Sequence, residues 1–319
     1  MGVLKEDFSE LKIFAGSASP KLAAEVAAIL KVPLGRAEIG AFADGENFVE
    51  ILESVRGKDV FLIQSTSAPV NSNAIQLCLM LDALKRASSR KLNAIVPYYG
   101  YSRQDRITGR SPITASLIAR FIQEAGADSF TSVDLHTPTI QGFFQIPTDN
   151  FSANTLFAEH FKKKGLKGED IVVVSPDVGG VKRARNLARK MGAELAVIDK
   201  HRPKANQSEV MHIVGEVEGK VCVICDDITD TGGSLVNAAQ ALKKKGAAKV
   251  YAAVTHGVLS GNSQQKIADS PDLEELVITN SIEHSTLHPK IKQLSLAPAV
   301  AEAIKCVYFH KSLSEKLEL

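Results

Sequence analysis

Acidic, hydroxyl and glycine residues follow an apolar run in the segment from Val221 to Ser234, VCVICDDITDTGGS. The apolar run predicts a short buried strand that ends at Cys225, with Asp226 and Asp227 at its carboxyl end. The residues that then open a helix are Asp230, Thr231, Gly232, Gly233 and Ser234. Backbone N–H groups and the helix dipole at such a loop favour a phosphate, and carboxylates accept hydrogen bonds from sugar hydroxyls. The segment therefore predicts a site for phosphorylated ribose. The alternative is an ordinary strand-to-helix turn with Asp and Thr as caps.

Short β-branched runs alternate with helical patterns along the chain and predict the elements that position this loop. The expected strands lie within 11–16, 59–65, 92–99, 129–135, 170–176, 193–199, 220–227, 249–256 and 273–280. Such alternation is typical of parallel sheets flanked by helices. It predicts an α/β fold with two domains, 1–151 and 152–296, and a last helix within 297–319 that could pack on the first domain.

Helical periodicity predicts which faces of two helices are buried. The expected core residues are Ile113, Leu117, Ile118, Phe121 and Ile122 in the first helix, and Leu235, Val236, Ala239 and Leu242 in the second. Lysine runs at 162–164 and 243–245 predict helix C-terminal ends, where cations complement the helix dipole.

Composition narrows the class of protein. The 319 residues are 45% hydrophobic, and 38 basic against 36 acidic residues leave a net charge of +2, so no general nucleic-acid or membrane-surface binder is expected. No apolar run approaches the ~20 residues that span a bilayer, and the start, MGVLKEDFSE, lacks a signal-peptide core, which predicts a cytoplasmic protein. The cysteines, Cys78, Cys222, Cys225 and Cys306, are expected to be reduced core thiols. Cys222 and Cys225 would face opposite sides of a strand, which favours packing over zinc.

Polar residues gather in five further segments. These are FADGE at 42–46, YSRQDR at 101–106, DLH at 134–136, SPDVGGV at 175–181 and DKHRP at 199–203. The ribose loop alone resembles a motif shared by type I phosphoribosyltransferases and ribose-phosphate diphosphokinases. All six segments, in this order, resemble the class I ribose-phosphate diphosphokinases (phosphoribosyl diphosphate synthases) over nearly the whole chain. The resemblance implies two domains of the type I phosphoribosyltransferase-like fold.

The resemblance implies an enzyme of nucleotide biosynthesis that requires Mg²⁺. It would transfer the β,γ-diphosphoryl group of ATP to the anomeric hydroxyl of D-ribose 5-phosphate, giving 5-phosphoribosyl 1-diphosphate and AMP. No G-x-x-x-x-G-K-[ST] loop occurs, so other cations must bind the triphosphate. The resemblance also implies roles for individual residues. Catalysis would fall to Lys200 and Arg202, and a regulatory anion would bind at Arg56. The residues implied for ATP are Phe42, Asp44, Glu46, Arg103, Gln104, Arg106 and His136. Those implied for ribose 5-phosphate are Asp226, Asp227, Asp230, Thr231, Gly232, Gly233 and Ser234, and those implied for the metal are His136, Asp177 and Asp134.

Several of these segments also have simpler interpretations. Lys200 and Arg202 would point the same way in an extended segment, which suits a closing loop, but the segment could be a solvated hairpin tip. Asp177 could cap a helix, Asp44-Gly45 is a hairpin signal, and a lone His136 could be structural.

The resemblance also implies an assembly. Phe42, Asp44 and Glu46 would receive adenine from a neighbouring subunit of a homo-oligomer, a hexamer built of dimers, with inorganic phosphate and ADP as effectors.

The sequence departs from the family pattern in three places. These are the short, less basic ITGRSPIT after Arg106, Gln145 in place of an aspartate and His201 in place of an arginine. The alternatives are a type I phosphoribosyltransferase and a non-catalytic regulatory homologue. The second would be expected to lack Lys200, Arg202 or the acidic loop, and all are present.

Overall fold

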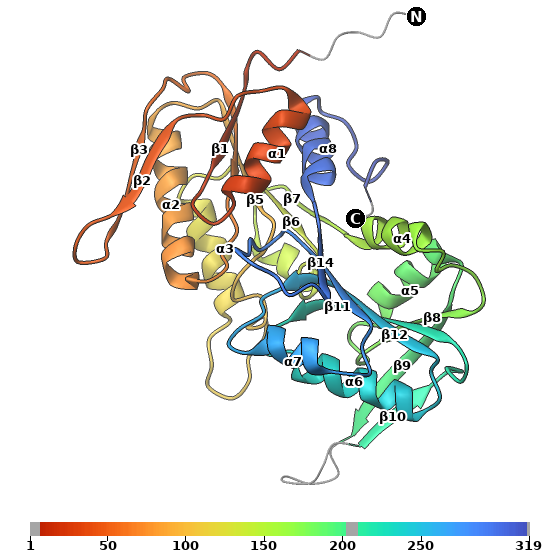
Figure 1. Cartoon of the computed structure of the whole chain (residues 1–319). Coiled ribbons are helices and arrows are strands. Elements are labelled where there is room, and N and C mark those ends of the chain that lie inside the picture. The colour runs from red at the N-terminus through yellow and green to blue at the C-terminus, as the bar shows by residue number, and fades with distance from the viewer. Residues whose placement is uncertain (1–6, 202–209, 318–319) are drawn as a thin grey trace, which may run out of the picture. The chain divides into compact units, whose positions relative to one another are not determined.

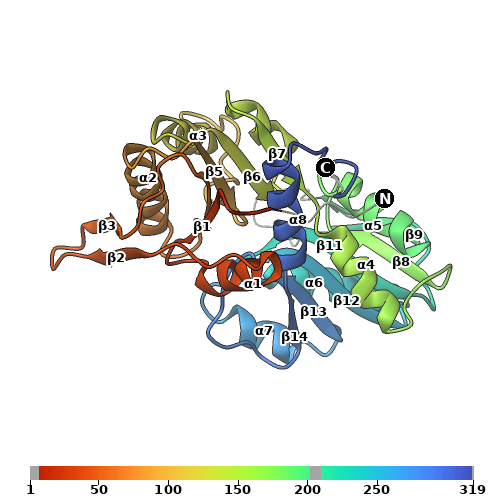
Figure 2. The same ribbon diagram turned by 90° about the horizontal axis from the view of Figure 1, so that it is seen from above.

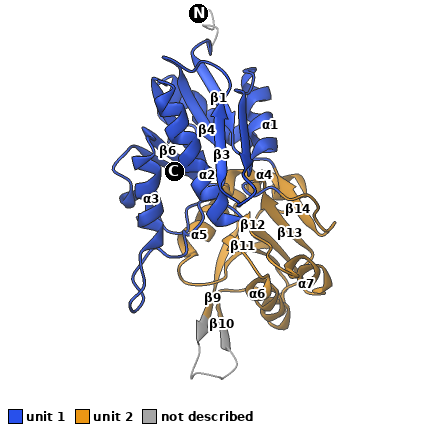
Figure 3. Cartoon of the chain, turned by 90° about the vertical axis from the view of Figure 1, so that its left-hand side faces the viewer, with its two compact units in different colours: residues 1–152, 281–283, 295–319 blue, residues 153–280, 284–294 orange. Residues whose placement is uncertain are grey.

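A computed structural model of the chain describes residues 7–201 and 210–317, apart from the side chains at 200, 201, 210 and 211 (Figure 1). Two compact units can be distinguished by their internal contacts (Figure 3). Unit 1 comprises Met1–Ser152, Ser281–Glu283 and Ser295–Leu319, and unit 2 comprises Ala153–Asn280 and His284–Leu294.

Unit 1 is built on a five-stranded parallel sheet in the order β1-β4-β5-β6-β7. The strands are β1 (Leu11–Ala15), β4 (Asp59–Ile63), β5 (Lys91–Val96), β6 (Ser129–Val133) and β7 (Thr148–Phe151). The helices are α1 (Pro20–Leu30), α2 (Val70–Arg86), α3 (Thr114–Glu124) and α8 (Ala297–Tyr308), with a 3-10 turn, η1 (Pro138–Phe143). Helices α2 and α3 lie on one side of the sheet, and α1 packs with α8 on the other (Figure 2).

A separate hairpin in unit 1 consists of β2 (Ala37–Ala41) and β3 (Asn47–Ile51), which pair antiparallel. The turn is closed by the Phe42 N–H, which donates to the Glu46 carbonyl oxygen at 2.8 Å. Gly45 has a φ of 94°, a conformation that glycine adopts without a Cβ penalty. The Asp-Gly signal for a hairpin is therefore confirmed.

Unit 2 contains a seven-stranded sheet in the order β10-β9-β8-β11-β12-β13-β14. The strands are β8 (Ile171–Ser175), β9 (Glu194–His201), β10 (Val210–Val214), β11 (Val221–Thr229), β12 (Lys249–Gly257), β13 (Glu275–Thr279) and β14 (Ile291–Leu294). All pairs are parallel except β9 with β10. Helices α6 (Gly233–Lys244) and α7 (Ser263–Asp269) cover one face, and α4 (Asn154–Lys163) and α5 (Val181–Met191) cover the other (Figure 1).

The expected α/β fold is confirmed, and all nine expected strands are present. Two details of the sequence interpretation are wrong. In α3, Ile122 is buried and Ile118 packs partly buried against the core as expected, but Phe121 is 44% exposed, and Ala115 and Ala119 are the other buried residues. Strand β11 continues to Thr229 instead of ending at Cys225, because β12 pairs with it throughout.

The remaining core expectations hold. In α6, Leu235, Ala239 and Leu242 are buried and Val236 packs partly buried against the same core. Helices α4 and α6 end within the predicted lysine runs. Cys222, Cys225 and Cys306 are buried, Cys78 is half-buried, and all four are free thiols. Within residues 7–201 and 210–317, no helix is long and apolar enough to span a membrane.

Candidate functional site

The strand order of unit 2 creates a crevice at one place. The chain runs from β8 to β9 in one direction along the sheet and from β11 to β12 in the other, so β8 and β11 flank a topological switch point. Ligands of open α/β sheets bind at such points, beyond the carboxyl ends of the strands. Strand β8 pairs with β11 only over Val221–Ile224, so the last part of β11 extends past its neighbour. Asp226 and Asp227 lie on that extension.

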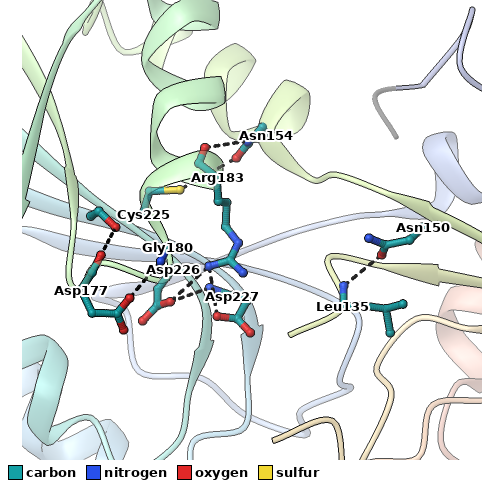
Figure 4. Close-up of polar contacts among 10 residues, drawn as sticks. Leu135, Asn150, Asn154, Asp177, Gly180, Arg183, Cys225, Asp226 and Asp227 are labelled. Carbon is teal, nitrogen blue, oxygen red and sulfur yellow. Dashed lines mark hydrogen bonds and ion pairs between the residues drawn. The ribbon is translucent and has the colours of Figure 1, made fainter. Parts of the chain in front are cut away.

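Arg183 of α5 contacts both aspartates (Figure 4). Its Nη1 lies 3.4 Å from Asp226 Oδ1 and 3.1 Å from Asp227 Oδ1. The backbone N–H of Asp227 also donates to Asp226 Oδ1 at 2.9 Å. The Asp227 side chain is 6% exposed and that of Asp226 is 29% exposed, so Asp226 is the more accessible of the two.

The electrostatics of this pair are set by burial. Loss of water, together with the neighbouring carboxylate of Asp227, raises the pKa of Asp226 to about 8, although Arg183 acts to lower it. Two carboxylates this close cannot both ionise easily without a cation. The carboxylates of Asp226 and Asp227 are therefore strong hydrogen-bond acceptors when ionised, and their charge depends on Arg183 and on pH.

The predicted phosphate loop joins β11 to α6. Gly232 is the N-cap, with a φ of 73°, and a Cβ there would lie 3.2 Å from the Ile267 side chain and 3.5 Å from the Ser263 carbonyl oxygen. Gly233 faces open space, with Thr231 Oγ1 as the only atom within 4 Å of a Cβ at that position. Thr231 and Ser234 are exposed, and Asp230 is half-buried. The loop thus presents the hydroxyls of Thr231 and Ser234 to solvent beside the N-terminus of α6.

Asp177 lies in the turn after β8 and is exposed. Its Oδ1 accepts a hydrogen bond from the Gly180 N–H at 2.9 Å, so the carboxylate does stabilise the start of α5 (Figure 4). Ser175 Oγ donates to the Asp177 carbonyl oxygen at 2.7 Å and holds the same turn. One carboxylate oxygen is engaged and the other points away from this bond, so the capping role leaves room for a ligand.

In unit 1 the YSRQDR segment follows β5. Arg103, Gln104 and Arg106 are exposed. Gln104 is held at the start of α3, where its Oε1 accepts from Thr114 Oγ1 at 2.6 Å. Asp105 Oδ2 accepts from Thr137 Oγ1 at 2.7 Å. This bond brings the basic segment next to the segment that contains His136.

The DLH segment leaves β6 with a strained backbone. Asp134 is 8% exposed and has a φ of 40°, a region that residues other than glycine rarely adopt. Asn150 Oδ1 of β7 accepts from the Leu135 N–H at 2.9 Å and holds the turn (Figure 4). His136 is half-buried. Strain that is held by a specific partner is typical of functional turns.

The remaining predicted residues are more exposed. Phe42 is 58% exposed at the hairpin and contacts the ring of Phe48, with centroids 5.2 Å apart. Asp44 and Glu46 are exposed, and so is Arg56. Lys200 lies in β9, where its backbone pairs with Met211, whereas its side chain and Arg202 lie outside the described residues.

No group of three or more His, Cys, Asp or Glu side chains able to hold a metal occurs in the part of the chain that the structure describes. Mg²⁺ commonly binds one or two carboxylates and takes its other ligands from water and substrate phosphates. An exposed carboxylate such as that of Asp177 fits this mode of binding. It does not require a preformed cage.

Sequence reasoning missed Arg183, Asn150 and also Asn154, whose Nδ2 donates to the Arg183 carbonyl oxygen at 3.1 Å. Arg183 belongs to an amphipathic helix with several other basic residues, VKRARNLARKM, so nothing in the pattern distinguishes it. The one available signal is its place in the first turn of α5, where a cation opposes the helix dipole.

Comparisons with known proteins agree with this architecture. The N-terminal domain of ribose phosphate pyrophosphokinase matches residues 11–126, and the phosphoribosyl synthetase-associated domain matches residues 200–317. A ribose-phosphate pyrophosphokinase of Clostridium perfringens is 52% identical over 309 residues, which cover 95% of this chain and 96% of that protein. One from Clostridium tetani is 50% identical over 317 residues, covering 98% and 99%. The crystal structure of phosphoribosylpyrophosphate synthetase from Mycobacterium smegmatis superposes with a TM-score of 0.87 at 42% identity and covers 95% of this chain and 100% of that chain.

The fold and these matches define an α/β enzyme of the transferase class. The chain belongs to the ribose-phosphate pyrophosphokinase family. The family resemblance inferred from the six polar segments is thereby confirmed.

Proposed function

We propose that this enzyme transfers the β,γ-diphosphoryl group of ATP to the anomeric hydroxyl of D-ribose 5-phosphate, which yields 5-phosphoribosyl 1-diphosphate and AMP. The observation that carries this proposal is the acidic edge of β11 followed directly by the open loop at Gly232, at the switch point of unit 2 in a chain of this family.

The sugar is assigned to unit 2. The Arg183 guanidinium and the Asp227 N–H both contact Asp226 Oδ1, and the Asp226 side chain is 29% exposed, so Oδ2 is assigned as an acceptor for a ribose hydroxyl. The 5-phosphate is assigned to the loop from Asp230 to Ser234, where the N-terminus of the twelve-residue helix α6 offers N–H groups and a favourable dipole. Thr231 and Ser234 add hydroxyl donors.

ATP is assigned to residues of unit 1. Arg103 and Arg106 are exposed cations that can neutralise a triphosphate. Because Gln104 Oε1 is occupied by Thr114, the amide nitrogen of Gln104 is its group for the nucleotide. Phe42, Asp44 and Glu46 are assigned to the adenine, with His136 beside the phosphates. The exposed ring of Phe42 supports the assignment of this hairpin to a neighbouring subunit of a homo-oligomer, a hexamer.

Mg²⁺ is proposed as the cofactor, with Asp177, Asp134 and His136 as its candidate protein contacts. When bound, the ion neutralises phosphate charge during the transfer. Phosphoryl transfer otherwise leaves the protein to position the groups, supply positive charge and exclude water. Lys200 and Arg202 are assigned to charge stabilisation of the transferring group, and Arg56 to an effector anion, inorganic phosphate or ADP. The cytoplasm is the proposed location.

The decisive experiment is incubation of the purified chain with ATP, ribose 5-phosphate and Mg²⁺, with and without inorganic phosphate. The expected products are AMP and 5-phosphoribosyl 1-diphosphate in equal amounts, identified by ³¹P NMR without any added acceptor base. A phosphoribosyltransferase would form no AMP, and a non-catalytic regulatory homologue would form neither product. Either result would sink the proposal. Stimulation by phosphate would assign the effector, and its loss in Arg56→Ala would locate it.

A further inference from the structure

Arg183 occupies a position that helix stability does not favour. It lies in the first turn of α5, two residues after Val181, where an acidic residue would interact better with the helix dipole. Its side chain is only 15% exposed, so a permanently charged guanidinium is held largely away from water. The compensation is the pair of carboxylates at 3.4 and 3.1 Å, which share one nitrogen, Nη1.

This contact restrains the more exposed aspartate. Asp226 Oδ1 interacts with two donors, Arg183 Nη1 and the Asp227 N–H, and this fixes the plane of the carboxylate (Figure 4). The position of the other oxygen, Oδ2, is then fixed by these two contacts before any ligand binds. A carboxylate that is oriented before its ligand arrives loses less conformational freedom on binding.

Asn154 holds both ends of this arrangement. It is 1% exposed at the start of α4, and its Nδ2 donates to the Arg183 carbonyl oxygen at 3.1 Å. Its Oδ1 lies 3.9 Å from the Cys225 sulfur, which can donate a weak hydrogen bond to it. Cys225 directly precedes Asp226 in β11. One buried amide therefore connects the backbone that carries Arg183 with the strand that carries the aspartates (Figure 4).

We propose that Arg183 is a positioning residue for the sugar, that it orients the carboxylates of Asp226 and Asp227 toward the ribose hydroxyls, and that Asn154 sets the position of Arg183. This inference rests on the proposed assignment of ribose 5-phosphate to β11. It adds two residues that act through the aspartates and do not themselves touch the substrate.

Charge supports the same role. Arg183 lowers the pKa of Asp226 against the effects of burial and of Asp227, so it favours the ionised form that accepts hydrogen bonds. The guanidinium presents its donors in a fixed plane, which a lysine ammonium cannot reproduce. A lysine at position 183 would supply charge without this orientation. The two functions of Arg183 can thus be separated by mutation.

The test uses the full-length protein and two readouts, calorimetric binding of ribose 5-phosphate and the pH dependence of kcat/KM for that sugar. Arg183→Gln should weaken ribose 5-phosphate binding more than tenfold and move the acidic limb of the pH profile to higher pH, because the pKa of Asp226 is no longer lowered. Arg183→Lys should restore most of the pH limb but only part of the affinity. Asn154→Ser should weaken binding severalfold, and its KM for ATP should stay unchanged.

Arg185→Gln is the matched control, since Arg185 is exposed on the same helix and should leave both readouts unchanged. If circular dichroism shows that Arg183→Gln is folded and the variant binds the sugar as tightly as the wild type, the inference is wrong. This holds even if the enzyme has the proposed activity. Should Arg183→Gln fail to fold, Arg183→Lys decides, and wild-type affinity in that variant overturns the inference. If the wild type binds the sugar, the variant does not, and no AMP is formed, the proposed function fails while this inference stands.

Discussion

The strand order β1-β4-β5-β6-β7 of unit 1 follows the chain from one edge of the sheet to the other, whereas the order in unit 2 reverses between β8 and β11. A reversal opens a crevice at the carboxyl ends of the two strands, and a sheet wound in one direction has none. In unit 2 the acidic residues accordingly lie at a place that topology alone marks as a binding site.

Unit 1 holds its candidate residues by other means. The Asp134 turn has a strained backbone that is held by Asn150, and the basic segment is held by the bond from Thr137 to Asp105. The hairpin at Phe42 lies outside the main sheet. The difference teaches that the proposed sugar site is built into the fold of unit 2, while the residues of unit 1 that we assign to the nucleotide depend on local loop contacts. Substitutions should therefore divide into effects on ribose 5-phosphate and the reaction, and effects on ATP.

The largest effect is expected at Lys200, which extends the strand next to β8. Lys200→Ala should lower kcat by about 10²–10³, as removal of a group that stabilises developing charge does elsewhere, and should change both KM values little. Steady-state kinetics with each substrate varied would show this. Lys182→Ala, an exposed lysine of α5, is the control. A kcat near that of the wild type would mean that Lys200 takes no part in the chemical step.

Asp226 should give a pH-dependent effect on the sugar only. Its carboxylate accepts hydrogen bonds when ionised, so kcat/KM for ribose 5-phosphate should rise with pH through the pKa of about 8. Asp226→Asn should abolish this rise and lower kcat/KM by roughly 10–100-fold, the worth of a charged hydrogen bond. Asp170→Asn, an exposed acid at the other end of β8, should do neither.

The same group makes a prediction for stability, with the sign set by the raised pKa. An acid whose pKa rises on folding, from ~3.9 in the unfolded chain, destabilises the folded state progressively as pH increases toward about 8. Asp226→Asn should therefore raise Tm at pH 9, by about 2–4 °C for each kcal/mol relieved, and change it little at pH 4. Equal shifts at both pH values would contradict a buried, perturbed carboxylate.

Phe42 tests the nucleotide side of the comparison. Because the ring is 58% exposed, Phe42→Ala should leave Tm unchanged, yet it should raise KM for ATP about tenfold, within the ~1–3 kcal/mol range of base–aromatic stacking. Ile29→Ala, at another exposed apolar residue, in α1, is the control and should leave KM for ATP unchanged. A rise in KM for ribose 5-phosphate instead would break the division between the units.

The smallest effect is expected at Asn150. Asn150→Ala removes the acceptor of the Leu135 N–H, which costs about 1 kcal/mol and corresponds to roughly fivefold in KM for ATP. Asn150→Asp keeps an acceptor oxygen at the same place and should stay near the wild type. Comparison of the two variants in ATP-varied kinetics separates the loss of the bond from the loss of the side chain. Equal behaviour would mean that the bond does not hold the turn.

Much of the fold, and the position of the loop between β11 and α6, could be predicted from the sequence, for a local reason. An apolar run followed by Asp-Asp and a Gly-Gly helix start encodes a strand, its polar end and the start of the next helix within one segment, VCVICDDITDTGGS. The Asp-Gly turn at 44–45 and the lysine-rich helix ends are equally local. Each of these signals needs no information on distant partners.

The features that were missed depend on partners far along the chain. The extension of β11 to Thr229 comes from pairing with β12, and the approach of Arg183 comes from the position of α5 beside β8. Phe121 lies on the exposed side of α3 because small residues, Ala115 and Ala119, face the core there. Asn150 and Asn154 are single residues whose hydrogen-bond partners lie 15 and 29 residues away in the sequence, so no short sequence pattern predicts their roles.

The part of β11 that extends past β8 has a consequence for folding as well as for binding. A strand edge without a neighbour invites pairing with another chain, and charged side chains at the edge oppose such pairing. Asp226 and Asp227 place charge there, and Asp226 also occupies the N–H of Asp227. We therefore expect the two aspartates to oppose pairing of this edge with another chain during folding. Variants that lose both charges should yield less soluble protein on refolding, even where the native state remains stable.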